Sequence, residues 1–157
     1  MNKTAVIALI CALAGASVPA LAAPRGSADV VKAAPAKAVV AAAAGARVDL
    51  AVQVEIAPSW HLYAHGDTTF IGVELVPDED FPLKEFAAVY PAGHEGVFFG
   101  EKVRMLEGTN LIKATALVPA GMQGEQPLEL KLTVQACDDK VCLAPAYLPV
   151  VFTLKVK

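Results

Sequence analysis

Three segments of the chain alternate between apolar and polar residues, a pattern typical of strands that are buried on one face. They run from Val48 to Ile56, from Leu128 to Val134 and from Leu148 to Val156. Shorter candidate strands lie at 70–76, 85–90, 102–106 and 111–118. The turn-forming residues at 107–110 predict a hairpin between the last two of these. About seven strands, with Pro and Gly turns and no convincing helix, predict an all-β, immunoglobulin-like antiparallel β-sandwich.

The N-terminal residues have the pattern of an export signal. Lys3 precedes an apolar stretch at 5–16, and Ala20-Leu21-Ala22 supplies the small residues that signal peptidase requires. The apolar stretch is too short for a transmembrane span. We therefore expect a cleaved signal peptide at 1–22 and a periplasmic domain. The Ala/Pro-rich residues 23–45 lack aromatic side chains and are interpreted as a linker, which leaves 46–157 as the folded domain.

The composition excludes several classes of partner. The 157 residues are 55% hydrophobic and 18% charged, with a net charge of −3, and the basic residues form no cluster. Nucleic acid and anionic membrane surfaces are therefore poor partners. The sequence also lacks a phosphate-binding glycine loop, a serine nucleophile elbow and a zinc-protease motif. We expect a monomer that needs no cofactor and no metal.

Candidate chemistry is concentrated in Cys137 and Cys142, the only cysteines outside the predicted signal peptide. In an oxidising compartment such a pair is a structural clip or a redox centre. Closing a loop of about six residues contributes roughly 2 kcal/mol, against nearly 5 for about a hundred residues, so the pair is a weak clip. Cu(I) or Zn(II) binding is a third possibility. The histidines available to such a metal site are His61, His65 and His94.

The strand pattern also places the first cysteine. Extending the alternation of 128–134 puts Cys137 in phase with the polar positions, which predicts a strand end near the surface. Asp138-Asp139 is turn chemistry, and Pro145 and Pro149 are expected to prevent regular pairing just after the second cysteine. Lys140 favours a thiolate while the two aspartates disfavour it, so any control of reactivity would come from exposure and partner fit.

Three segments together resemble one protein family. Residues 134–145, Val-Gln-Ala-Cys-Asp-Asp-Lys-Val-Cys-Leu-Ala-Pro, look like the active-site hairpin of the N-terminal periplasmic domain of the DsbD thiol:disulfide interchange family. Residues 57–64 resemble the aromatic segment near that family's cysteines, and 96–102 resemble its cap loop. The resemblance covers roughly Val48 to Val156 and implies the immunoglobulin-like fold that the strand pattern predicts.

The resemblance also implies roles for individual residues. The second cysteine would exchange with a partner protein, the first would resolve the mixed disulfide, and an aromatic residue would cover the pair. Carried over by position, these residues are Cys142 as the exchanging sulfur, Cys137 as the resolver, Phe98 as the cap, Phe99 as part of the cap loop, and Tyr63 and His61 as lining. Gly96-Val97 stands where the family cap usually carries acidic residues, which puts acid–base assistance from that position in doubt.

The family's parent protein continues into a membrane domain and a thioredoxin-like domain, whereas this sequence ends at Lys157. We therefore expect a thioredoxin-like or membrane-embedded thiol reductant in trans, with oxidised periplasmic thiol proteins as the other partners. The alternative is a non-catalytic β-sandwich interaction module, or a copper-linked accessory module, with a structural disulfide. In that interpretation Trp60 and Tyr63 are core residues, and Phe98 and Phe99 plug the end of the sandwich.

Overall fold

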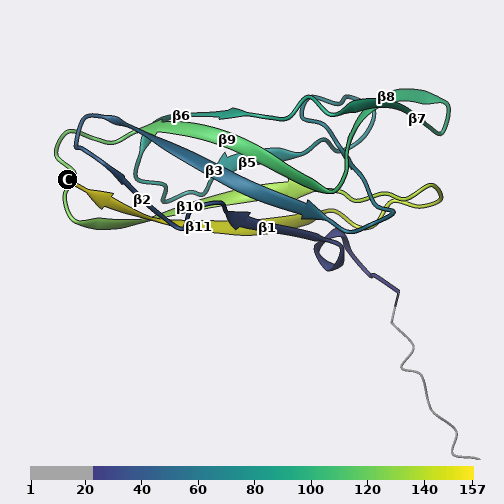
Figure 1. Ribbon diagram of the computed structural model, residues 1–157, viewed down its shortest axis with the longest axis horizontal. Coiled ribbons are helices and arrows are strands. Elements are labelled where there is room, and N and C mark those ends of the chain that lie inside the picture. Colours follow the sequence, from purple (N-terminus) through teal and green to yellow (C-terminus); the bar gives the residue numbers. More distant parts are fainter. Residues whose placement is uncertain (1–22) are drawn as a thin grey trace, which may run out of the picture.

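A computed structural model describes residues 23–157, and the predicted signal peptide at 1–22 lies outside them. Two four-stranded sheets form a sandwich, and a small three-stranded sheet extends from one end (Figure 1). Within residues 23–157 the only helical element is the 3-10 helix η1 (Ser27–Asp29). No helix in this range has the length and apolar character needed to cross a membrane. The predicted all-β sandwich is confirmed.

The two large sheets contain eight of the strands. The first sheet, in spatial order, consists of β1 (Val31–Pro35), β3 (Arg47–Ile56), β9 (Thr109–Leu117) and β6 (Lys84–Val89). The second consists of β2 (Val39–Ala42), β11 (Ala146–Val156), β10 (Glu125–Val134) and β5 (Glu74–Pro77). All neighbours are antiparallel except β2 and β11, which are parallel.

The core lies between these sheets and follows the sequence alternation. In β3 every second residue from Val48 to Ile56 is buried, and in β10 the same holds from Leu128 to Val134. β11, the neighbour of β10 in the second sheet, contributes Val150, Phe152 and Leu154 to the same core. The polar residues between them point outward, as expected for sheets with one solvated face. The strand predictions from period-2 alternation are therefore correct for these elements.

The prediction that residues 23–45 form a linker is wrong. β1 pairs with β3, from Val31 opposite Ile56 to Pro35 opposite Val52. β2 pairs with the last residues of β11, and Val40 in it is 8% exposed. Alanine offers little contrast between buried and exposed positions, so the alternation in these short edge strands is hard to recognise. Pairing with longer neighbours decides their structure.

Two local predictions also need correction. The predicted hairpin around 107–110 does not form. The strand before this turn belongs to the small three-stranded sheet, whereas β9 belongs to the first large sheet. Pro149 does not prevent pairing: it lies inside β11, opposite Lys131 of β10. Among the strands of residues 23–157, β10 is the only neighbour of β11 at that point, since β2 joins from Thr153 onward. A proline is tolerated where a strand has one open side.

The small sheet positions the candidate site. It consists of β4 (Leu62–Tyr63), β8 (Glu101–Leu106) and β7 (His94–Phe98), in that order. In Figure 1, β7 and β8 lie at the same end of the sandwich as the β10–β11 connection and the first described residues, whereas the C terminus lies at the opposite end. Three segments distant in sequence therefore meet at one end of the domain.

Candidate functional site

The β10–β11 connection carries a disulfide between Cys137 and Cys142. The amide of Asp138 donates to the carbonyl of Val141 at 2.9 Å, and the amide of Leu143 donates to the carbonyl of Ala136 at 2.8 Å. These bonds flank the two cysteines, which form a non-hydrogen-bonded antiparallel pair with Cα atoms 4.0 Å apart. Facing side chains are closest in such pairs. The backbone itself therefore holds the two sulfur atoms against each other.

The turn of this hairpin is fixed by Asp138. Its Oδ1 atom accepts hydrogen bonds from the amides of Lys140 and Val141, both at 2.8 Å. This is an Asx-type turn, in which a side chain replaces a backbone acceptor. The two amides lower the pKa of the Asp138 carboxyl, because they stabilise its charged form. The predicted turn chemistry thus acts through one carboxylate.

His61 pairs with the cysteine hairpin through its backbone. Its amide donates to the carbonyl of Cys137 at 2.9 Å, and the amide of Cys137 donates to the carbonyl of His61 at 3.0 Å. Directly opposed residues in an antiparallel pair present their side chains on the same face. His61, Cys137 and Cys142 therefore form one row of neighbouring side chains across three segments.

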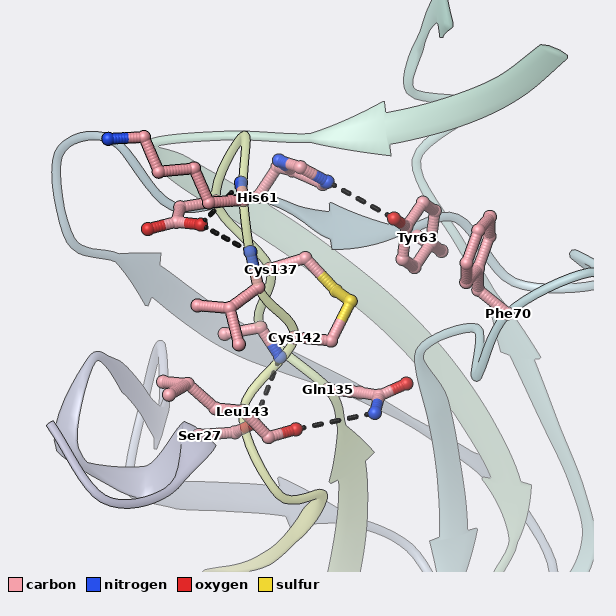
Figure 2. Close-up of a disulfide and its surroundings, with 12 residues drawn as sticks. Ser27, His61, Tyr63, Phe70, Gln135, Cys137, Cys142 and Leu143 are labelled. Atoms are coloured by element: carbon pink, nitrogen blue, oxygen red, sulfur yellow. Dashed lines mark hydrogen bonds between the residues drawn. A yellow bond between two sulfur atoms is a disulfide. The ribbon is translucent and has the colours of Figure 1, made fainter. Parts of the chain in front are cut away.

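Aromatic rings surround this row. Cys137 belongs to a buried cluster with Tyr63, Phe98 and Val103. Phe70, Met105 and Cys142 pack against the cluster while remaining partly exposed. Phe70 stacks on Tyr63 with ring centroids 4.3 Å apart, and Phe98 meets Tyr63 edge-on at 5.9 Å. Figure 2 shows the disulfide directed toward the Tyr63 and Phe70 rings.

Burial shifts both polar groups of the cluster toward their neutral forms. His61 Nε2 lies 3.4 Å from the Tyr63 hydroxyl oxygen. Burial raises the pKa of Tyr63 to about 12. Burial also lowers the pKa of His61, against the opposing effect of the carboxylates of Glu107, Asp139 and Asp138. A neutral, apolar environment of this kind does not stabilise a thiolate. Any reactivity of the pair would therefore be controlled by access rather than by a stabilised thiolate.

The β7–β8 hairpin, residues 94–106 and here called the cap hairpin, lies against the cluster. Phe98, the last residue of β7, is only 6% exposed, whereas the next residue, Phe99, is 71% exposed. Phe99 and Gly100 both have positive φ, +50° and +85°, as in a two-residue type I′ turn. Positive φ is rare for a bulky residue. This turn sends one ring inward and the other into solvent.

The two sulfur-bearing residues differ in exposure. Cys137 is fully buried at 0%, and Cys142 is partly exposed. The prediction that Cys137 lies near the surface is wrong. The alternation of buried positions continues past the end of β10 to Ala136 and then breaks, because Ala136 and Cys137 are both buried in succession. Extending a strand phase beyond the end of the strand caused the error.

Most of the predicted site residues meet in space. The structure brings Cys137, Cys142, His61, Tyr63 and Phe98 together and leaves Phe99 on the surface. Sequence reasoning missed Phe70, Val103 and Met105. Phe70 carried a weak signal as the first residue of a predicted strand, but its stacking on Tyr63 depends on tertiary structure.

Of the three histidines, His61 alone lies beside the cysteines. His65 stacks on Tyr90 with ring centroids 3.9 Å apart, and His94 lies 3.8 Å from the Glu107 carboxylate. Across residues 23–157, no group of three or more His, Cys, Asp or Glu side chains is arranged to hold a metal ion. The metal-site interpretation therefore receives no support from this part of the chain.

Fold and site together define an immunoglobulin-like sandwich with a hairpin disulfide beneath an aromatic cluster. The family described as "Thiol:disulfide interchange protein DsbD, N-terminal" matches residues 27–152. The chain belongs to this family of thiol:disulfide interchange domains. No curated protein matches the chain significantly.

The solved structures that are similar to the chain include two N-terminal domains. The N-terminal periplasmic domain of ScsB from Proteus mirabilis has a TM-score of 0.53 at 16% identity, over 70% of this chain and 42% of that chain. The reduced DsbD N-terminal domain of Neisseria meningitidis has a TM-score of 0.48 at 20% identity, over 70% of this chain and 80% of that chain. The chain thus spans less than half of the ScsB structure, and that similarity shows a common fold.

Proposed function

We propose that this domain is a periplasmic electron carrier that exchanges disulfides with partner proteins through Cys142, with Cys137 as the resolving thiol. Membership of the interchange family supports the class of reaction. The observation that carries the division of labour is the unequal exposure of the two residues, because Cys142 is partly exposed and Cys137 is fully buried. We expect a partner thiolate to approach at Cys142, since this is the cysteine residue that reaches the surface.

The proposed reaction has two directions. During reduction of the domain, a partner thiolate attacks Cys142 Sγ, the intramolecular S–S bond breaks, and Cys137 leaves as a thiolate that takes up a proton. The partner's second thiol then attacks the mixed disulfide and leaves Cys142 as a thiol. In the opposite direction Cys142 attacks an oxidised partner, and Cys137 displaces the reduced partner and closes the disulfide again. Two electrons and two protons pass in each cycle.

The partners are proposed from the chemistry of the site and from the family. The donor is a thioredoxin-like or membrane-embedded dithiol protein that acts in trans, and the acceptors are oxidised thiol proteins of the periplasm. The buried position of Phe98 supports a role as a cover that a partner displaces. The cap hairpin contributes this ring from an edge strand, β7, that pairs only with β8 in the part of the chain that the structure describes.

Single-cysteine variants test the assignment. With the oxidised, disulfide form of a thioredoxin-like protein as probe, the Cys142 thiol of Cys137→Ser should attack the probe's disulfide and release one probe thiol. The resulting mixed disulfide should accumulate, because no Cys137 thiol remains to resolve it. Cys142→Ser should form no such adduct, since its remaining thiol is buried. Both variants lack the intramolecular disulfide, so each is the matched control of the other. Adduct formation is read on a non-reducing gel and by mass spectrometry. Equal trapping by Cys142→Ser would contradict the proposal.

The reduction potential of the pair provides a second test. Structural disulfides in exported proteins have potentials below about −300 mV, whereas exchanging pairs lie higher. We expect the wild-type protein to cycle reversibly with a thioredoxin-like donor and to have a potential above that limit. A pair that resists the donor and lies below the limit would favour the structural-disulfide alternative.

A further inference from the structure

Ser27 is a fully buried polar residue that the exchange reaction does not use. It is 0% exposed and lies in η1, more than a hundred residues from the cysteines in sequence. Its hydroxyl donates to the carbonyl of Ala144 at 2.8 Å and accepts from the amide of Ala136 at 2.9 Å. The Ser27 amide also donates to the Ala144 carbonyl, at 3.0 Å. A buried side chain with this many partners positions what it contacts.

The two contacts of the hydroxyl lie on opposite arms of the cysteine hairpin. Ala136 directly precedes Cys137, and Ala144 follows Cys142 by two residues. One hydroxyl group therefore bridges the two arms next to the disulfide, and Figure 2 shows Ser27 beside Leu143 at this position. Gly26 extends the contact by forming a parallel bridge with Ala144. We call this set of bonds the Ser27 clamp.

The clamp joins the arms without using the sulfur atoms. The backbone bond from Leu143 to Ala136 and a 3.3 Å bond from the Gln135 side chain to the Leu143 carbonyl also cross between the arms. None of these bonds requires the disulfide to be present. After reduction they keep the two thiols opposite each other. A dithiol held in this way closes readily, because less conformational entropy is lost on forming the bond.

We infer that Ser27 is a positioning residue of the redox pair, which makes the dithiol easier to oxidise by holding both arms of the cysteine hairpin in register. The inference rests on the proposed function, since it concerns the same exchange reaction. The relevant equilibrium is protein disulfide plus two glutathione thiols against protein dithiol plus oxidised glutathione, with two electrons and two protons transferred. Loss of the clamp leaves the oxidised hairpin closed by its S–S bond but lets the reduced hairpin widen. The equilibrium then shifts toward the dithiol.

The test is the equilibrium of the purified protein in glutathione buffers of defined ratio, with the dithiol fraction read by alkylation and mass spectrometry. For Ser27→Ala we expect the equilibrium constant for disulfide formation to fall about threefold to tenfold. At 29.6 mV per tenfold change, this is a potential roughly 14 to 30 mV less negative. Ser27→Thr retains the hydroxyl and should restore most of the wild-type value. An unchanged or more negative potential in Ser27→Ala would overturn the inference.

Tyr90→Phe is the matched control for a purely structural effect. The Tyr90 hydroxyl accepts from the amide of Leu75 at 2.9 Å, outside the cysteine hairpin. Its loss should lower stability and leave the potential unchanged. A shift equal to that of Ser27→Ala would show that any destabilisation moves the potential, which would contradict a specific role for the clamp. Wild-type cycling with no shift in Ser27→Ala would refute the clamp alone and leave the proposed function standing.

Two milder variants test the inference if Ser27→Ala does not fold. The exposed Asp29 carboxylate accepts from the amides of Arg25 at 2.7 Å and Gly26 at 3.1 Å, and it thereby holds the turn that presents Ser27. Asp29→Ala should shift the potential in the same direction by a smaller factor. Gln135→Ala removes the longer bond between the arms and should also shift it less than Ser27→Ala. Folded Asp29→Ala and Gln135→Ala proteins with wild-type potentials would count against the inference.

Discussion

The two hairpins at the site end of the domain differ in how firmly they are held. The cysteine hairpin pairs with His61 on one side, and Gly26 and Ser27 hold its other arm. The cap hairpin is attached through β8 to a β4 of only two residues, and β7 has no second neighbour among the described strands. Regions with few backbone bonds to neighbours open more easily than the rest of a fold. The cysteine hairpin is thus held firmly, and we expect access to its sulfur atoms to depend on how easily the cap hairpin opens.

Among substitutions that test this difference between the two hairpins, we expect the largest effect from Phe98→Ala. Removing the buried ring uncovers the disulfide while the cysteine hairpin keeps its own hydrogen bonds. We expect reduction by dithiothreitol to accelerate about tenfold, which corresponds to about 1.4 kcal/mol less protection by the closed cover. The measurement is the rate of appearance of free thiols under pseudo-first-order conditions.

Phe99→Ala is the control for this rate. It removes an equally large ring from the adjacent position; that ring is 71% exposed and contacts the Phe98 ring, with centroids 4.3 Å apart, but it is not part of the buried cluster that contains Cys137. We expect its reduction rate to stay close to that of the wild type. Equal rates for Phe98→Ala and wild type would show that the cap hairpin does not limit access.

A smaller effect, an increase in stability, is expected at the tip of the cap hairpin. Phe99 has a φ of +50° in a type I′ turn, a position where asparagine is favoured before glycine. Phe99→Asn should relieve backbone strain and raise the free energy of unfolding by about 1 kcal/mol, the lower end of the range of costs for strained non-glycine residues. Chemical denaturation of the oxidised protein measures this change. A loss of stability would show that the exposed ring contributes more by packing than its backbone costs.

The smallest expected effect is the pH dependence of stability that His61 causes. Burial lowers the folded-state pKa of His61 below its ordinary value of 6.5, so the unfolded chain binds a proton more readily than the folded one. Stability should therefore be constant above about pH 7 and fall as the pH drops through the unfolded-state value near 6.5. His61→Gln should show a flatter decline. Denaturation curves at pH 7.5 and 5.5 compare the two proteins, and identical slopes would remove His61 as a source of the dependence.

Sequence reasoning performed best where burial on one face is strong. The alternation in β3 and β10 predicted both strands and their inward residues, because Val, Leu and Ile contrast clearly with charged neighbours. It failed for β1 and β2, whose alanines give no such contrast and whose pairing comes from β3 and β11. Local pattern is a weak guide to edge strands.

The candidate site was predictable in its chemistry and less so in its geometry. The cysteine spacing identified the hairpin, and the family resemblance brought in Tyr63 and Phe98. The burial of Cys137 was not predictable, because it depends on His61 pairing with it beyond the end of β10. The role of Ser27 was equally unpredictable. Its hydrogen-bond partners are distant in sequence and are backbone groups, which residues of any type provide.

The placement of the chain ends has a practical consequence for handling the protein. The first described residues lie at the same end of the sandwich as the disulfide, and the C terminus lies at the far end (Figure 1). A sensor surface, fluorophore or affinity tag joined through Lys157 would leave the sulfur atoms pointing away from the support. The same label near Arg25 would crowd the end of the sandwich at which we propose that a partner docks. Exchange measurements on an immobilised domain should therefore use C-terminal coupling.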